Sequence, residues 1–127
     1  MRICIDIDGV LASFKKEGQT YADVAPIEGS VETLKMWKNQ GHYLILHTAR
    51  HMKTCDGNIG KVIAKVGKVT IDWLDIHGFV YDELLFGKPW AEVYIDDNAF
   101  RFLSWKNLKG DAEKVLPKYK EKLAAKL

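Results

Sequence analysis

Apolar residues at both odd and even positions mark four short stretches of the chain. The first is RICIDI at residues 2–7, and this pattern is typical of a strand covered on both faces, as in a parallel sheet. HYLILH at 42–47 predicts a second buried strand, FVYDELLF at 79–86 a third and EVYID at 92–96 a fourth.

Two longer stretches have apolar residues at helical spacing instead. The first begins at Ser30, a residue type that caps helix N-termini, and ends at Gly41. The second covers residues 59–76, where Gly67 leaves open whether the chain forms one bent helix or two. Shorter helical segments are expected at two later places, after Asn98 and from Asp111 onward.

Strands and helices therefore mostly alternate along the chain. This order predicts an α/β fold with a doubly wound, mostly parallel sheet in three layers. The length of 127 residues fits a single domain spanning residues 1–127.

The composition narrows the function classes. With 19 basic and 17 acidic residues, the chain has no basic stripe of the kind that binds nucleic acid, and no apolar segment is long enough to span a membrane. Cys4 is expected to be buried in the first strand and Cys55 lies in a polar loop, so the two do not form a disulfide framework. A cytoplasmic location is the expectation.

Reactive side chains follow the predicted strands at their carboxyl ends, where ligands bind in sheets of this class. Asp6 and Asp8 point to the same side of an extended chain because side-chain direction repeats every two residues. Clustered carboxylates at such an edge need a counter-charge, and Mg²⁺ suits oxygen ligands of this kind. This edge gathers four carboxylates, a hydroxyl and a lysine, which are Asp6, Asp8, Asp96, Asp97, Thr48 and Lys88. Ala49, Arg50 and His51 follow Thr48.

This combination of residues suits phosphoryl transfer. Asp6 is the candidate nucleophile, and Asp8 is the candidate general acid and base. Lys88 and Mg²⁺ would neutralise charge on the transferring group. The candidate substrate-binding residues are Gly9, Thr48, Ala49, Arg50 and Lys88, although Arg50 fits a surface charge as well as a substrate clamp.

At these residues the sequence resembles the haloacid dehalogenase-like (HAD) superfamily of phosphohydrolases. Four stretches match its motifs in order: DIDGV at 6–10, LILHT ending in Thr48, GKP around Lys88, and VYIDD ending in Asp96 and Asp97. The resemblance implies that Asp6 forms an aspartyl-phosphate and binds Mg²⁺. It also implies that Asp8 binds the metal through its backbone carbonyl, that Asp96 is the third protein ligand, and that Asp97 supports a metal-bound water or Lys88.

Neither gap between these motifs is long enough for the cap domain that the superfamily usually carries. The resemblance therefore implies a capless member, whose site is open to large substrates or covered by a neighbouring subunit of a homo-oligomer. The loop at 15–29 would serve as a short flap, and small capless relatives include sugar-phosphate phosphatases. Trp90 fits the site entrance or the core.

Two other function classes stay open at this point. A receiver-like signalling module also combines clustered acids, a hydroxyl and a lysine, although it has them in a different order. A non-catalytic phosphate-binding domain is the other alternative. A phosphomutase is a close variant of the phosphatase, but it normally needs a cap.

Overall fold

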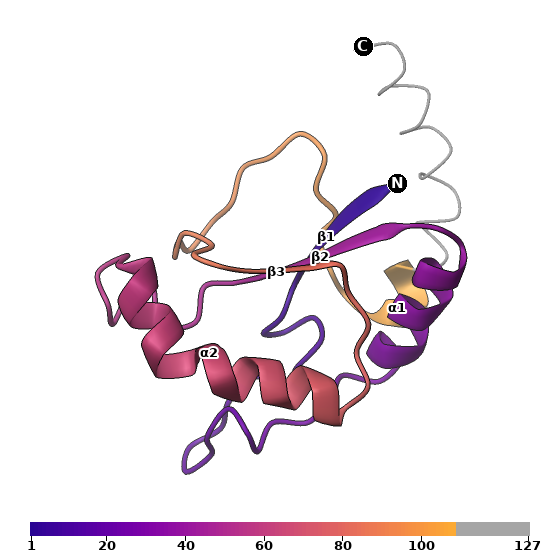
Figure 1. Ribbon diagram of the computed structural model, residues 1–127. Coiled ribbons are helices and arrows are strands. Elements are labelled where there is room, and N and C mark those ends of the chain that lie inside the picture. The colour runs from indigo at the N-terminus through magenta and orange to yellow at the C-terminus, as the bar shows by residue number, and fades with distance from the viewer. Residues whose placement is uncertain (109–127) are drawn as a thin grey trace.

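Three parallel strands form the sheet in the computed structural model, which describes residues 1–108 (Figure 1). They are β1 (Arg2–Asp6), β2 (Tyr43–Thr48) and β3 (Glu83–Phe86), in the order β1-β2-β3. The register pairs Ile5 with Leu46 and Thr48 with Phe86. The expected α/β class with a parallel sheet is confirmed.

Helix α1 (Ser30–Asn39) connects β1 to β2, and α2 (Ile59–Ile76) connects β2 to β3. Ser30 is the first residue of α1 and not its cap; the cap position is Gly29, whose φ of 86° favours a residue without a side chain. Helix α2 runs unbroken through Gly67 and is capped by Asn58, whose side chain accepts a hydrogen bond from the backbone of Lys61.

The strand order places both helices on one face of the sheet. Right-handed crossovers between strands in sequential order carry each connecting helix to the same side. Ile5, Leu44 and Leu46 are accordingly buried on that side, whereas Cys4 and Leu85 on the opposite side are exposed. The part of the chain that the structure describes therefore has two layers, so the expected third layer and doubly wound arrangement are not confirmed, and burial of Cys4 was a wrong prediction.

The core lies between the sheet and the two helices. Trp37 of α1 and Trp73 of α2 both belong to it. Phe79 stacks on Trp73 with ring centroids 5.2 Å apart, and Trp105 meets Trp37 edge-on at 5.6 Å. These contacts tie the loop before β3 and the last described residues to the two helices.

The third strand is shorter than predicted. It begins at Glu83, and Asp82 just before it uses both its backbone N–H and its carboxylate to bond the backbone of Leu44. Residues 79–82 thus approach the sheet through this side-chain contact and through the Phe79 packing.

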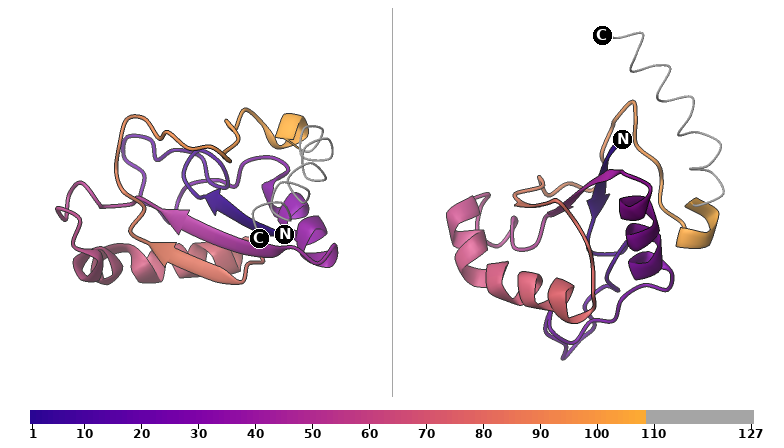
Figure 2. Two further views of the ribbon diagram at one scale, coloured as in Figure 1. Left: turned by 90° about the horizontal axis from the view of Figure 1, so that it is seen from above. Right: turned by 45° about the vertical axis from the view of Figure 1, so that its right-hand side comes forward.

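The prediction of a fourth strand at 92–96 is wrong. Residues 87–104, here called the outer segment, form an irregular excursion that passes the carboxyl ends of the strands and then runs beyond β1, away from α2 (Figure 2). Val93 is 71% exposed and Ile95 is 98% exposed. An apolar β-type sequence needs a partner edge to become a strand, and these residues make no ladder with β1.

Two further expectations concern the end of the chain. No helix begins at Asn98, whose backbone N–H instead bonds the Asp96 carboxylate at 3.2 Å; a helical turn starts only at residue 105. The helix expected from Asp111 lies outside the described residues. Within residues 1–108, no helix has the length and apolar character needed to cross a membrane.

Candidate active site

A tight turn after β1 sets the positions of the first two acidic residues. The carbonyl of buried Ile7 accepts hydrogen bonds from the backbone of the three residues Val10, Leu11 and Ala12, at 3.2, 2.8 and 3.0 Å. Gly9 has a φ of 82°, which allows the chain to reverse, and its N–H bonds the carbonyl of Ala12 at 2.7 Å. The turn holds Asp6 and Asp8 at the lining of one cavity.

Lys88 is fixed at this site by the end of β2. The backbone N–H groups of Gly87 and Lys88 both bond the carbonyl of Thr48, at 3.3 and 3.1 Å. The Lys88 ammonium then lies 3.1 Å from Oδ2 of Asp6, with 15% and 30% of the two side chains exposed. The structure therefore brings together the candidate nucleophile and the candidate charge-neutralising lysine, 82 residues apart in the chain.

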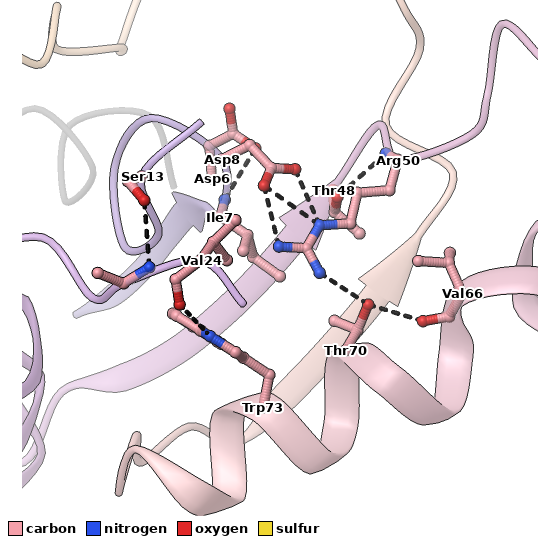
Figure 3. A network of polar contacts seen from close by, with 11 residues as sticks. Asp6, Ile7, Asp8, Ser13, Val24, Thr48, Arg50, Val66, Thr70 and Trp73 are labelled. Atoms are coloured by element: carbon pink, nitrogen blue, oxygen red, sulfur yellow. Dashed lines mark hydrogen bonds and ion pairs between the residues drawn. The ribbon is translucent and has the colours of Figure 1, made fainter. Parts of the chain in front are cut away.

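Asp8 is held by an arginine (Figure 3). Nε of Arg50 donates to both carboxylate oxygens of Asp8, at 3.2 and 3.0 Å, and Nη2 donates to Oδ1 at 2.9 Å. Nη1 donates to Oγ1 of Thr70 at 3.0 Å, and that hydroxyl in turn donates to the carbonyl of Val66 at 2.7 Å. Arg50 is thus anchored to α2, and its fully buried side chain is neither a surface charge nor a freely accessible substrate clamp.

An aromatic residue from the 15–29 loop covers the arginine. The guanidinium carbon of Arg50 lies 4.1 Å from the ring centroid of Tyr21, and His51 meets the same ring edge-on at 5.9 Å. Burial, and next the negative charge of Asp8, raise the pKa of Tyr21. Sequence reasoning missed Tyr21, because one aromatic residue in a polar loop has no periodic signal.

The loop that was expected to be a flap is fastened to the core. The indole N–H of Trp73 donates to the carbonyl of Val24 at 2.8 Å. Backbone bonds also join Ser13 to Ala25 and Ile27 to Leu11, at 2.9 and 2.8 Å. The loop is therefore a wall of the site.

These elements enclose an open cavity of about 450 Å³. Its acidic floor is Asp6 and Asp8, and Trp90 stands at its edge with 48% of its surface exposed and the ammonium of Lys53 4.5 Å from its ring. Trp90 thus lines the site and is not a core residue. The complete lining is Asp6, Asp8, Phe14, Lys15, Tyr21, Ala49, Arg50, His51, Lys53, Thr54 and Trp90.

The two histidines near the site favour their neutral forms. Burial lowers the pKa of His47, and the positive charge of Lys88 lowers it further. For His51, burial and then the charges of Lys65 and Lys15 lower the pKa. Neither histidine is therefore suited to supply a permanent positive charge for an anionic ligand.

Other predicted site residues lie elsewhere. Thr48 is fully buried, and its hydroxyl accepts the backbone N–H of Arg50 at 3.1 Å, so it closes the turn after β2 and does not line the cavity. Asp96 and Asp97 lie on the outer segment and are exposed. The structure does not bring this pair to the cavity of Asp6 and Asp8.

The cavity floor fits a magnesium ion in part. Among residues 1–108, no group of three or more His, Cys, Asp and Glu side chains lies close enough to hold a metal. One carboxylate nevertheless suffices for Mg²⁺, since this ion commonly takes one or two carboxylates and completes its shell with water and phosphate oxygens. Asp6 would hold the ion through its carboxylate, and Asp8 through its backbone carbonyl, because the Asp8 carboxylate pairs with Arg50.

Comparisons with known proteins place the chain in a family. No protein-family model matches it, and no curated protein matches it significantly. A structure of a Pnkp1/Rnl/Hen1 complex matches with 25% identity and a TM-score of 0.50, over 84% of this chain and 32% of that one. A crystal structure of a target protein from Vibrio cholerae matches with 32% identity and a TM-score of 0.73, over 89% of this chain and 97% of that one. Because this similarity extends over nearly all of both chains, the protein belongs to the same family as the Vibrio cholerae protein.

Proposed function

We propose that the protein is a Mg²⁺-dependent phosphomonoester hydrolase in which Asp6 is the nucleophile. The observation that carries this proposal is the position of Asp6 at the floor of the cavity, 3.1 Å from the Lys88 ammonium, with Asp8 two residues further on. A carboxylate beside a fixed cation can attack a phosphorus atom whose oxygens that cation neutralises. The sequence resemblance to HAD phosphohydrolases points to the same chemistry.

The reaction proceeds in two steps at these side chains. In the first, a carboxylate oxygen of Asp6 bonds to phosphorus, the ester P–O bond breaks, and the leaving oxygen takes a proton from Asp8. In the second, Asp8 takes a proton from a water whose oxygen bonds to phosphorus, and the bond between phosphorus and Asp6 breaks. Inorganic phosphate and the alcohol are the products, and both carboxyl groups return to their initial states.

Lys88 is the positive charge that this chain supplies beside Asp6, and its backbone contacts to Thr48 keep it there. Its ammonium stabilises the negative charge that spreads over the phosphoryl oxygens in the transition state. Mg²⁺ held by Asp6 and Asp8 would supply further positive charge for the same oxygens.

The substrate class is a small phosphomonoester, such as a sugar phosphate or another phosphorylated metabolite. The cavity of about 450 Å³ suits a ligand of that size, and its lysines Lys15 and Lys53 suit a ligand with negative charge. The wall formed by residues 15–29 takes the place of a cap domain.

The test is hydrolysis of p-nitrophenyl phosphate by the protein and by Asp6→Asn. We expect Asp6→Asn to abolish turnover while the melting temperature stays close to that of the parent. EDTA should abolish the activity of the parent and added Mg²⁺ should restore it. Asp72→Asn is the matched control, because Asp72 is an exposed aspartate on α2 that pairs with Lys68 one turn away.

Two results would contradict the proposal. Unchanged turnover in Asp6→Asn would remove the nucleophile. A stable phosphorylated protein that releases no phosphate would favour the receiver-like signalling module, in which the acyl phosphate is the end product.

A further inference from the structure

We propose that Arg50 is a positioning residue for Asp8, and that it acts by fixing the carboxylate plane from which the proton is transferred. This inference rests on the proposed function and deepens it. It replaces the expectation that Arg50 binds substrate, because its side chain is fully buried and its contacts are made inside the protein.

The guanidinium is constrained on three sides. One edge donates three hydrogen bonds to Asp8, at 2.9 to 3.2 Å, in the fork geometry that arginine and carboxylate share. The opposite nitrogen donates to Thr70, and the Tyr21 ring covers a face. Arg50 therefore cannot turn without breaking a contact to β1's turn, to α2 or to the 15–29 loop.

The hydroxyl of Thr70 fixes the position of the far end of the Arg50 guanidinium. This hydroxyl is fully buried and both accepts from Arg50 and donates to the carbonyl of Val66 one helical turn earlier. A hydroxyl donates only one hydrogen bond, so the bond to Val66 leaves its lone pairs directed to Arg50. Through Arg50, this contact fixes the orientation of the Asp8 carboxylate relative to α2.

Asp8 keeps capacity for chemistry after this pairing. The two carboxyl oxygens of Asp8 offer about four lone-pair sites, and Arg50 occupies three of them with N–H contacts. The fourth site can carry the proton that the first step gives to the leaving oxygen. The side chain of Asp8 is 24% exposed and lies on the cavity floor, whereas that of Arg50 is 0% exposed. Asp8 can therefore face the leaving oxygen while Arg50 holds it from behind, and a prepared orientation of this kind lowers the barrier to proton transfer.

Two substrates with different leaving groups can distinguish a role of Arg50 in positioning Asp8 from a purely structural role. A p-nitrophenolate leaving group departs without protonation, whereas the alkoxide of an alkyl phosphate such as glycerol phosphate needs the proton from Asp8. The ratio kcat/KM reports the first phosphoryl transfer and excludes the later hydrolysis of the aspartyl-phosphate. We therefore expect Arg50→Met to lower kcat/KM for the alkyl phosphate by about 10²-fold and for the aryl phosphate by less than about tenfold.

Three further variants sharpen this test. Asp8→Asn should show the same preference for the aryl phosphate, and adding Arg50→Met to it should cause little further loss, since the two residues act as one unit. Arg50→Lys should not restore the alkyl phosphate activity, because an ammonium lacks the planar fork. Arg2→Met is the matched control. It removes an exposed arginine with its ion pair to Glu83, and it should leave kcat/KM unchanged for both substrates.

Thr70→Val provides a second way to test the inference if Arg50→Met does not fold. It removes only the buried hydroxyl and should lower the alkyl phosphate activity selectively, by a smaller factor. Equal losses on both substrates in these variants would indicate a purely structural role and overturn the inference. A rise in KM with kcat unchanged would also overturn it, since that result indicates substrate binding. Either outcome leaves the proposed function intact provided that Asp6→Asn is inactive.

Discussion

The turn after β1 and the outer segment carry similar acidic pairs in very different surroundings. Asp6 is the last residue of β1 and Asp8 lies in the turn after it, and each acid has a cation at hydrogen-bonding distance. Asp96 and Asp97 follow EVYID, an equally strand-like sequence, yet Ile95 beside them is 98% exposed. Of these two apolar runs, the one that pairs with a neighbouring strand has its acids at the cavity.

Backbone pairing accounts for the difference. All five residues of β1 pair with β2, whose own end pairs with β3, and this brings Asp6, Thr48 and Lys88 to one edge. The outer segment is fastened at both ends, by the contacts of Lys88 to Thr48 and by the indole of Trp105, which donates to the carbonyl of Val10 at 2.7 Å. Between those points it has no ladder in the described structure.

The largest expected effect on stability comes from a substitution in the paired strands. Leu46→Ala removes a fully buried side chain of β2 and should lower the free energy of unfolding by about 2–5 kcal/mol. Ile95→Ala, in the outer segment, should change it by less than about 0.5 kcal/mol. Urea denaturation of both variants gives the two values, and a loss in Ile95→Ala comparable to that in Leu46→Ala would contradict the placement of the outer segment.

A smaller effect is expected at the turn itself. Gly9→Ala should cost about 1–2 kcal/mol, because a residue with a side chain is strained at a φ of 82°. The added Cβ would also come within 2.5 Å of the Phe14 ring and displace it. Gly18 is the matched control, with a φ of 79° and nothing near the position of a Cβ.

The difference between those two glycine variants isolates the Phe14 contact. Phe14 is 71% exposed and can move, so we expect Gly9→Ala to exceed Gly18→Ala only modestly in thermal melts. Adding Phe14→Ala to Gly9→Ala should remove the excess. An excess that persists in the double variant would show that the turn has a further constraint.

The smallest expected effect concerns the second acidic pair. The structure predicts that Asp96→Asn keeps the stability, the turnover and the Mg²⁺ dependence of the parent, because this side chain lies on the exposed outer segment. The family resemblance implies the opposite, since it makes Asp96 a metal ligand. Loss of Mg²⁺-dependent turnover with normal stability would show that residues 92–96 move to the acid site during the reaction.

Most of the helices and strands could be predicted from the sequence. The helical spacing of 59–76 gave the bounds of α2, and the buried strand at 42–47 was displaced by one residue from β2. Local patterns predicted the bounds of these segments better than their buried faces. Ile59, Ile63 and Ile71 of α2 are 46%, 49% and 42% exposed, and β2 fully buries only every second residue. The proximity of Lys88 to Asp6 followed as well, because parallel strands end at one edge of a sheet.

The misplaced residues share a different cause. The exposure of Cys4 depends on which face the helices cover, and that follows from strand order and not from the residues of β1. The burial of Arg50 depends on Thr70 and Tyr21, which no spacing rule connects to it. The position of 92–96 depends on a pairing partner, which a propensity does not supply.

The two fastening points of the outer segment have a consequence for what the chain can accommodate. A loop closed at Lys88 and at Trp105 has already lost most of the entropy that closure costs, and each further doubling of its length adds only about 0.6 kcal/mol. Extra residues inserted between those points should therefore lower the free energy of unfolding only slightly. They would also emerge beyond β1, on the side of the molecule away from α2 (Figure 2), which makes this stretch a suitable place to graft a reporter peptide or a second folded unit.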